Sequence, residues 1–262
     1  MAVYLHHFSN VSAEIRLNNI VSAVRRNYAR LAPEAERPGQ ELLIVAGGPS
    51  MPGMLSLLRA LHPVHPILAV NGAHDFLRSL DPPLLPEFAV MLDADPVMRG
   101  VMRHPGPETL YLMANQCDPE VLSALGRHRM LLWHVGGDTG EAEPFTSESN
   151  WTVVHNGCTG GLRAISLGMV LGYRRFHLFG VDSCHLDGKS HGYEHAPGQE
   201  TRLEVRLGGG SFRCEPWMLA QALDFGQMLA KFPSWGITVR VHGPGLLAAM
   251  SCHPTPRLEL LS

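Results

Sequence analysis

The sequence is short of lysine and has no surplus of positive charge. Of its 262 residues, 21 are Lys or Arg and 24 are Asp or Glu, which gives a formal net charge of −3 at pH 7. Only two of the basic residues are lysines, Lys189 and Lys231. A faintly acidic chain lacks the basic excess on which binding of polymeric nucleic acid depends, so this class of partner is excluded. A mechanism that needs a lysine has only these two candidates.

Long apolar runs and paired cysteines are also missing. No run approaches the roughly 20 apolar residues of a membrane span. The segment Met1–Phe8 lacks the basic and apolar regions of a signal peptide. The five cysteines are scattered and include no C-x-x-C pair, which favours reduced thiols over a disulfide framework or a zinc ribbon. We therefore expect a cytoplasmic protein without a membrane span.

The sequence does contain 45% hydrophobic residues, arranged mainly in short runs. That fraction is too high for a disordered chain and is sufficient for one large domain with a compact core. An apolar stripe of helical period predicts a helix over residues 12–31, which Pro33 ends. The predicted strands are the apolar runs at residues 42–46, 67–70, 88–92, 109–113, 130–134, 176–179 and 238–241. The predicted helices between them cover residues 52–61, 73–80, 96–103, 119–125, 158–171 and 217–232.

Continuous apolar strands that alternate with helices are typical of a parallel sheet covered on both faces. We therefore expect an α/β fold with a Rossmann-like open, mostly parallel sheet. An N-terminal helix and a loop or hairpin insertion near residues 182–215 would be added to it. The expected organisation is a helical extension over residues 1–41 and one domain over residues 42–262. Ligands of such sheets bind beyond the carboxyl ends of the strands, which directs attention to the residues after each run.

The first predicted strand runs into the turn Gly47-Gly48-Pro49-Ser50. Two glycines let the backbone approach a ligand, Ser50 is a natural N-cap, and Pro52 suits a first helical turn. Such a turn directs N–H groups and the positive end of a helix at an anion, typically phosphate. An ordinary tight connection is an equal alternative, because the motif is neither G-x-G-x-x-G nor a P-loop.

Polar residues also follow the second and third predicted strands. Asn71 either caps the next helix, which is the simpler alternative, or hydrogen-bonds a base or ribose, and Gly72 permits close approach. Asp93 and Asp95 follow the third strand, and two carboxylates in this place are typical of Mg²⁺ held near phosphates. Because Asp95 precedes Pro96 and suits an N-cap, we expect Asp93 to be the metal ligand.

A second glycine turn, Thr159-Gly160-Gly161, opens a mostly apolar helix. Its glycines serve either close helix packing or a second phosphate cradle. Thr159 places a hydroxyl at the start of the helix.

The segment from residue 182 to residue 195 is dense in titratable groups and follows a predicted strand, which suggests a site. These groups are Asp182, His185, Asp187, Lys189, His191, Glu194 and His195. Gly188-Lys189-Ser190 looks like the end of a P-loop, but Ser183 stands where that motif needs glycine, so we reject it. Zinc at His191 and His195 is disfavoured without H-E-x-x-H, and incidental surface histidines are another alternative. We favour one loop histidine as general base.

Several of these elements occur together, in order, in one known family. The segments are Ala46–Ser50, Val70–Ala73, Pro86–Asp93, Thr159–Ala164 with Leu171–Tyr173, and Leu178–Asp182 with Asp187–His191. They resemble the MptE-like family, named for an archaeal 6-hydroxymethyl-7,8-dihydropterin diphosphokinase, which includes the core of motility accessory factors. The resemblance covers about residues 42–250.

The same skeleton is similar to bacterial CMP-sialic-acid sialyltransferases, in which the Gly-Pro-Ser turn and the Asn contact the nucleotide. A histidine beyond the later Gly-(Ile/Val)-Asp strand serves there as base. The resemblance thus implies nucleotide contacts at Gly48, Ser50, Asn71 and Thr159, and a base at His191 or His195.

The activity that the resemblance implies is diphosphoryl transfer from ATP–Mg²⁺ to a small hydroxylated acceptor such as a hydroxymethylpterin. The glycine turns would hold phosphates, and Asp93 would hold Mg²⁺. Asp182 is a further candidate for the metal and a candidate catalytic residue, and a loop histidine would take the hydroxyl proton. Lys189 would supply a counter-charge, with Arg163 or Arg202 as substitutes. The alternatives are a CMP-sugar-dependent glycosyltransferase and a nucleotide-binding module without turnover. The expected partners are a nucleotide and a small acceptor, and a homo-oligomer stays an open alternative.

Overall fold

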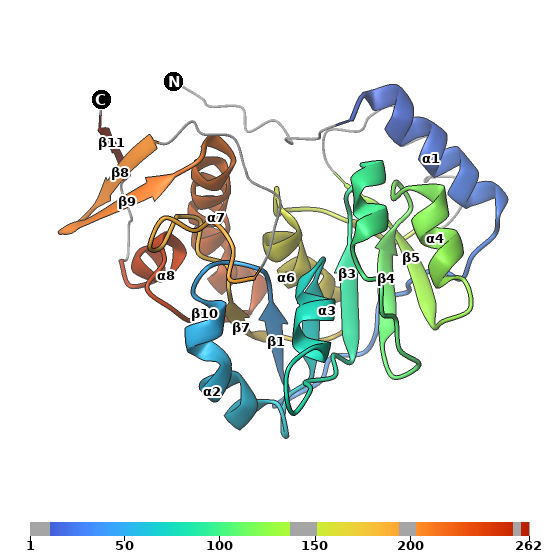
Figure 1. Cartoon of the computed structure of the whole chain (residues 1–262), viewed down its shortest axis with the longest axis horizontal. Coiled ribbons are helices and arrows are strands. Elements are labelled where there is room, and N and C mark those ends of the chain that lie inside the picture. The colour runs from blue at the N-terminus through green and yellow to red at the C-terminus, as the bar shows by residue number, and fades with distance from the viewer. Residues whose placement is uncertain (1–10, 137–150, 194–202, 254–257, 262) are drawn as a thin grey trace.

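The computed structural model describes residues 11–136, 151–193, 203–253 and 258–261. Its centre is an eight-stranded sheet with the strand order β10-β7-β1-β2-β3-β4-β5-β6. All neighbouring strands in this sheet run parallel. Helices lie in front of the sheet and behind it in Figure 1. The predicted Rossmann-like α/β fold is therefore confirmed.

The strands of the main sheet follow the apolar runs closely. They are β1 (Glu41–Val45), β2 (Ile67–Val70), β3 (Phe88–Met91), β4 (Leu110–Ala114), β5 (Met130–Val135), β6 (Val153–Val154), β7 (Arg175–Phe179) and β10 (Thr238–Val241). Each of the seven predicted strands is present to within one residue at either end. The two-residue strand β6 was not predicted from the sequence.

The helices are α1 (Ala13–Arg25), α2 (Met51–Leu61), α3 (Ala73–Arg78), α4 (Pro119–Leu125), α6 (Gly160–Val170), α7 (Pro216–Trp235) and α8 (Leu246–Ser251). A 3₁₀ helix, η1, covers Pro96–Gly100 in place of the helix expected to residue 103. In the part of the chain that the structure describes, none of the helices is long and apolar enough to cross a membrane.

The first helix is shorter than predicted, because it ends at Arg25 and not at residue 31. Asn27 adopts a left-handed conformation with a φ of 50°. The chain then pairs with β5: the Leu31 N–H donates to the Leu132 carbonyl at 2.8 Å, and the Leu132 N–H donates to the Ala29 carbonyl at 2.9 Å. Pairing with the sheet thus overrides the helical pattern of this segment.

A small antiparallel sheet forms the predicted insertion. The hairpin of β8 (Leu203–Leu207) and β9 (Gly210–Cys214) pairs along its length, and β11 (Glu259–Leu261) joins β8 on the other side. Figure 1 shows this sheet projecting at the edge of the molecule, beside α7 and α8.

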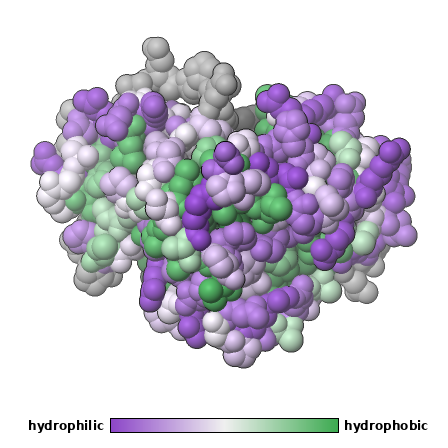
Figure 2. All heavy atoms as spheres, turned by 60° about the horizontal axis from the view of Figure 1, so that its bottom comes forward, coloured by the Kyte–Doolittle hydropathy of each residue, from purple (hydrophilic) through white to green (hydrophobic). Residues whose placement is uncertain are grey.

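The main sheet separates two apolar cores. The smaller core lies between the sheet and the helices α2 and α3, and it includes Leu43, Phe179, Leu58 and Leu77. The larger core includes residues of α6 and α7, and also Ala23 of α1. The N-terminal helix therefore packs on the same core as the sheet. On the face shown in Figure 2, apolar side chains reach the surface in patches between polar ones.

Candidate functional site

The position of β1 in the sheet makes its carboxyl end a candidate place for a ligand. In the sheet, β1 lies between β2, which follows it through α2, and β7, which follows α6. The helix α2 packs on the face of the smaller core, and α6 packs on the face of the larger one. Open α/β sheets bind ligands at the carboxyl ends of strands where successive connections leave on opposite faces.

The Gly-Pro-Ser turn after β1 is tied to the end of β7. The Ser50 N–H donates to Asp182 Oδ2 at 2.9 Å, and the Gly48 N–H donates to the Gly180 carbonyl at 2.8 Å. The Asp182 residue is only 4% exposed. Burial raises the pKa of its carboxyl group, and the Ser50 hydrogen bond partly offsets this rise. Asp182, predicted as a catalytic residue, thus has the surroundings of a positioning residue that holds this turn.

The N–H groups at the start of α2 already have acceptors within the protein. Besides the Ser50 N–H, the Met51 N–H donates to the Gly48 carbonyl and the Gly53 N–H to the Ser50 carbonyl, both at 3.1 Å. An anion at Ser50 would therefore compete with the Asp182 carboxylate for one N–H. The expected phosphate contact at Ser50 stays a prediction, and Gly47 and Gly48 are the more accessible part of the turn.

The side chain of Asn71 does not cap the next helix. The helix α3 starts after Gly72, whose cap position has no side-chain hydrogen bond. Asn71 has a φ of 49°, and its Oδ1 is buried without a hydrogen-bond partner among the described residues. A Cβ added at Gly160 would lie 3.8 Å from Asn71 Nδ2, so this side chain borders the start of α6. A buried acceptor without a donor favours the ligand-binding alternative over capping.

The turn before α6 is fixed by a residue of α7. Thr159 Oγ1 caps α6 through the Leu162 N–H at 3.5 Å and accepts a hydrogen bond from Gln221 Nε2 at 2.5 Å. Gln221 Oε1 accepts from the Ser183 hydroxyl at 2.6 Å. Gln221 thereby joins the start of α6 to the loop after β7. No motif in the sequence marks it, because its role depends on contacts with distant segments.

The two glycines of this turn serve close packing. A Cβ at Gly160 would lie 2.8 Å from Val70 Cγ1, and one at Gly161 would lie 3.3 Å from Val181 Cγ1. A side chain at Gly160 would overlap Val70 of β2, and one at Gly161 would be in tight contact with Val181 after β7. This geometry favours packing over a second phosphate cradle.

Asp95 caps a helix as expected, and the metal-ligand role of Asp93 stays a prediction. Asp95 caps η1 by accepting the Val97 N–H at 2.9 Å, and Asp93 Oδ1 accepts the Asp95 N–H at 3.0 Å. Burial raises the pKa of Asp93, and the charge of Asp95 adds to this effect. Among the described residues, no group of three or more His, Cys, Asp or Glu side chains could hold a metal ion. Asp93 thus fits Mg²⁺ that arrives with phosphates, which needs only one or two protein carboxylates.

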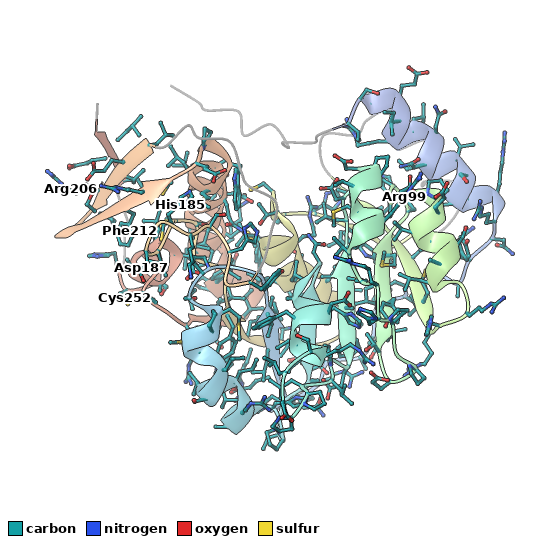
Figure 3. All side chains as sticks on the ribbon, in the orientation of Figure 1. Arg99, His185, Asp187, Arg206, Phe212 and Cys252 are labelled. Atoms are coloured by element: carbon teal, nitrogen blue, oxygen red, sulfur yellow. The ribbon has the colours of Figure 1, made fainter. Side chains whose placement is uncertain are left out.

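The loop after β7 sends its titratable groups in different directions. His185 Nε2 lies 3.1 Å from Glu215 Oε1 at the start of α7, and its side chain is 8% exposed. In Figure 3, His185 and Asp187 lie on the side of the molecule that carries β8 and β9. His185 is therefore an anchor for the insertion, not a group that faces the Gly-Pro-Ser turn.

The Gly-Lys-Ser segment forms a tight turn. Leu186 and Lys189 exchange backbone hydrogen bonds at 3.1 and 2.9 Å around Asp187 and Gly188, which have φ values of 50° and 75°. An Asp-Gly pair with two positive φ angles is typical of a two-residue hairpin turn. Lys189 is exposed at its end. The rejection of a P-loop agrees with this geometry.

The segment at Gly192 and Tyr193 returns to the glycine turns. The Gly192 N–H donates to the Gly47 carbonyl at 3.0 Å. The Tyr193 hydroxyl abuts both Gly47 and Gly72, and a Cβ added at Gly72 would lie 3.0 Å from it. The Tyr193 ring stacks on Phe76 with centroids 5.2 Å apart, and burial raises its pKa to about 12. Tyr193, which the sequence did not single out, covers the place where the two turns meet.

Of the two histidines considered as base, His191 is close to this place. Its ring centroid lies 6.2 Å from that of Tyr193, and its Nδ1 lies 3.1 Å from the Ser190 hydroxyl. His195 and Arg202 lie outside the described residues.

A second polar cluster lies at the same edge of the sheet, beyond β4 and β5. His134 Nδ1 hydrogen-bonds Asn115 Oδ1 at 3.0 Å, and burial together with the charge of His155 lowers the pKa of His134 to about 4. Arg163 of α6 is buried and donates to the carbonyls of Gly136 at 3.0 Å and Val154 at 2.5 Å. Arg163, considered as a substitute counter-charge, thus holds the ends of β5 and β6.

Comparison with known proteins places these features in a family. A family model described as 6-hydroxymethylpterin diphosphokinase MptE-like matches residues 16–188. The structure of the MAf glycosyltransferase from Magnetospirillum magneticum AMB-1 is similar with a TM-score of 0.66 and 14% identity, over 91% of this chain and 40% of that one. A mammalian sialyltransferase structure gives a TM-score of 0.45 and 10% identity, over 90% of this chain and 87% of that one. No curated protein sequence matches.

These comparisons have different weight. The likeness to the MAf glycosyltransferase, at 14% identity, shows the fold alone, and this chain spans 40% of the length of that protein. The family description names a diphosphokinase, which is a transferase. The family model covers well over half of the sequence, from α1 to the loop after β7. The chain belongs to the MptE-like family.

Proposed function

We propose that the protein is a nucleotide-dependent transferase whose nucleotide lies across the ends of β1 and β2 and the start of α6. The observation that carries this proposal is the buried Oδ1 of Asn71, which has no hydrogen-bond partner among the described residues. It lies between two glycine turns at the ligand-binding edge of the sheet. An amide acceptor there suits a hydroxyl or amino group of a ribose or base.

The reaction that we propose is diphosphoryl transfer from ATP to a small hydroxylated acceptor, in line with the description of the family. Asp93 would hold Mg²⁺, which when bound neutralises the charge of the transferred phosphates. The raised pKa of Asp93 supports this role, because a carboxylate that burial disfavours as an anion gains most from a nearby cation. His191 would take the proton of the acceptor hydroxyl, and Asp182 would hold the Gly-Pro-Ser turn in place.

The second candidate is a glycosyltransferase with a CMP-sugar donor. The fold that this chain shares with the MAf glycosyltransferase over 91% of its length favours this candidate. The same turns would hold the nucleotide, and His191 would deprotonate the acceptor hydroxyl in either reaction. The donor is therefore what separates the two candidates.

A thermal-shift screen of ATP, GTP, CMP and CMP-sugars, with and without Mg²⁺, tests the donor. A ligand that binds only the native state raises its stability by mass action. We expect the largest rise in Tm with ATP and Mg²⁺, and we expect Asn71→Ala to abolish it. Asn18→Ala, at an exposed position of α1, is the matched control and keeps it. Preference for CMP or a CMP-sugar without metal would replace the diphosphokinase with the glycosyltransferase, and no response to any nucleotide would refute both.

Turnover separates an enzyme from a binding module. With the donor identified, transfer to a hydroxymethylpterin is followed for the wild type and for His191→Ala and His195→Ala. We expect a fall in kcat for the variant of the base, on the order of 10²–10⁴-fold. If both variants keep full turnover, the general-base role is wrong. Nucleotide binding without transfer to any acceptor would leave the non-catalytic module as the function.

A further inference from the structure

A separate cavity lies at the opposite, amino-terminal end of the strands of the main sheet. It has a volume of about 340 Å³ and opens at the amino-terminal halves of β1, β7 and β10, with Glu41, Arg175, His177, Thr238 and Arg240 in its lining. The candidate nucleotide site uses the carboxyl ends of the strands, so the two places are distinct. This volume is within the range of small-molecule sites.

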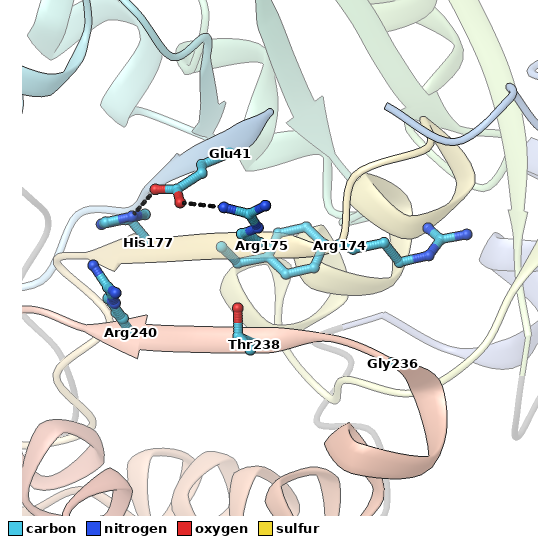
Figure 4. Close-up of a pocket in the computed structure, with 8 residues that line it drawn as sticks. Glu41, Arg174, Arg175, His177, Gly236, Thr238 and Arg240 are labelled. Carbon is cyan, nitrogen blue, oxygen red and sulfur yellow. Dashed lines mark hydrogen bonds and ion pairs between the residues drawn. The ribbon is translucent and has the colours of Figure 1, made fainter. Parts of the chain in front are cut away.

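The charged groups of this cavity share one face of the sheet. β10 pairs with β7 in parallel, with Thr238 opposite Arg175 and Arg240 opposite His177. Because side chains alternate along a strand, Thr238 and Arg240 project on the same side of β10. Figure 4 shows both reaching toward the β7 side of the cavity, with Arg175 and His177 above them.

The only carboxylate among the residues lining this cavity is already neutralised by its neighbours. Glu41 accepts a hydrogen bond from His177 Nε2 at 2.6 Å and lies 3.4 Å from Arg175 Nη1 and 3.8 Å from His65 Nε2. Burial alone would raise the pKa of Glu41, but the hydrogen bond and charge of His177, with the charge of His65, lower it overall. Glu41 therefore remains an anion whose charge is matched within the protein.

Arg240 is exposed. Its backbone pairs with β7, but among the described residues its guanidinium group has neither a hydrogen bond nor an ion pair. The wall behind it is rigid, because His242 Nε2 lies 2.8 Å from His177 Nδ1 and the His242 ring stacks on Phe179 with centroids 4.5 Å apart. Arg174, the third arginine of the lining, donates to the carbonyls of Met169 and Tyr173. The guanidinium groups of Arg175 and Arg240 and the hydroxyl of Thr238 thus line a preformed cavity in which positive charge is in excess.

We propose that this cavity binds a small anionic ligand whose phosphate or carboxylate group is held by Arg240 and Arg175, with the Thr238 hydroxyl as a further donor. The planar fork of a guanidinium matches the oxygens of both groups. A charge on the edge strand β10 also discourages pairing with another chain. Protection of the edge strand would account for Arg240, but it would not account for the cavity or for Arg175 beside it.

Isothermal titration of the full chain with inorganic phosphate and, separately, with malonate tests the proposal. We expect at least one probe to bind, and the one that binds identifies the group. Arg240→Gln should weaken its affinity roughly tenfold or more, because it removes a charge-assisted hydrogen bond. Thr238→Val should weaken it to a smaller extent. Arg206→Gln removes the same charge from an exposed position of β8 and should leave the affinity unchanged.

Two results would overturn the proposal: neither probe binds the wild type, or Arg240→Gln binds as tightly as the wild type. Phosphate can also enter the candidate nucleotide site, and competition with ATP and Mg²⁺ separates the two places. Binding of the probe that saturating ATP abolishes and Arg240→Gln preserves belongs to the nucleotide site and contradicts the proposal. Perturbation of the His177 and His242 NMR signals by the bound probe would give an independent location.

Discussion

At Gly48 the chain has no room for a side chain. A Cβ there would overlap Asp182 Oδ2 and would lie 2.5 Å from the Gly180 carbonyl oxygen. Gly53, in the first turn of α2, has no atom within 4 Å of an added Cβ. We expect Gly48→Ala to lower the free energy of unfolding by about 1–3 kcal/mol and Gly53→Ala to raise it by about 0.4–1 kcal/mol. Urea unfolding of both variants checks this, and equal effects would refute the packing argument.

The ionised side chain of Asp93 at the proposed site lowers the stability of the folded protein. Since its pKa is raised in the folded state, the folded protein binds this proton more tightly than the unfolded chain does. Its ionisation therefore lowers stability as the pH rises through the folded pKa, and the cost is absent below the unfolded pKa. We expect Asp93→Asn to be more stable than the wild type at neutral pH, and this gain to shrink as the pH falls toward the usual range of aspartate.

Nucleotide binding gives a second test of Asp93. The same variant should lose the Mg²⁺-dependent part of the nucleotide thermal shift, since an amide does not replace a carboxylate on Mg²⁺. Asp95→Asn, at the cap of η1, is the matched control and should retain it. If the Mg²⁺ dependence of binding survives in Asp93→Asn, Asp93 is not the metal ligand.

Among the elements, α1 is hydrogen-bonded through the side chain of Asn19 to the segments that follow β3 and β4. Asn19 Nδ2 donates to the carbonyls of Gln116 at 2.9 Å and Ala94 at 3.4 Å, and Asn19 is 7% exposed. Asn19→Ala removes the donor and should cost about 1–3 kcal/mol of stability. The exposed neighbour Asn18→Ala should change it by less than about 0.5 kcal/mol. Chemical denaturation of the two variants distinguishes this hydrogen bonding from a general effect on the helix.

Tyr193 covers both glycine turns, and we expect it to move when a ligand reaches them. Its hydroxyl abuts Gly47 and Gly72, and its pKa is about 12 because it is buried. Displacement by a nucleotide would expose the phenol and bring its pKa back toward about 10. A spectroscopic titration of tyrosinate with and without nucleotide should show this change, and Tyr193→Phe should lack it. An unchanged titration in the presence of saturating nucleotide would contradict the displacement.

The strands were predictable because of where they lie. Those of a parallel sheet are buried on both faces and read as continuous apolar runs, as Leu42–Val45 and Ile67–Val70 do. The edge strands β6 and β11 have two and three residues, too few for a pattern. The first helix was predicted too long for a similar reason. Residues 29–31 pair with β5, which lies about 100 residues later in the chain, and a local sequence pattern does not contain that contact.

The site was predictable only where its chemistry is local. Glycine turns, the Asp95 cap and the Asp187-Gly188 turn depend on neighbouring residues and could be read from them. The roles of Gln221, Tyr193 and Asn115 depend on contacts across the fold. His185 shows the limit of local reasoning. It lies in the loop that was predicted to form a site, but its side chain contacts Glu215 at the start of α7.

For the whole molecule, two histidines with lowered pKa values predict sensitivity to acid. The pKa values of His134 and His242 are lowered to about 4 by burial. The unfolded chain therefore binds more protons between about pH 6.5 and pH 4, and stability falls as the pH falls through this window. Urea unfolding against pH should show the loss, and His134→Gln should reduce it by on the order of 2–3 kcal/mol. His253→Gln, at an exposed position, is the control, and a pH profile identical to that of His134→Gln would refute the assignment.

The strand order of the main sheet has a consequence for folding. The central strand β1 pairs with β2 soon after it in the chain, but its other neighbour, β7, begins only at Arg175. During synthesis from the N-terminus, one side of β1 therefore stays unpaired and accessible to other strands until most of the chain has been made. Contacts of such long sequence separation slow folding, and unpaired edges promote aggregation. A fragment that stops before β7 would retain β1 to β6 and leave that edge permanently uncovered, so a soluble minimal domain has to extend through Phe179.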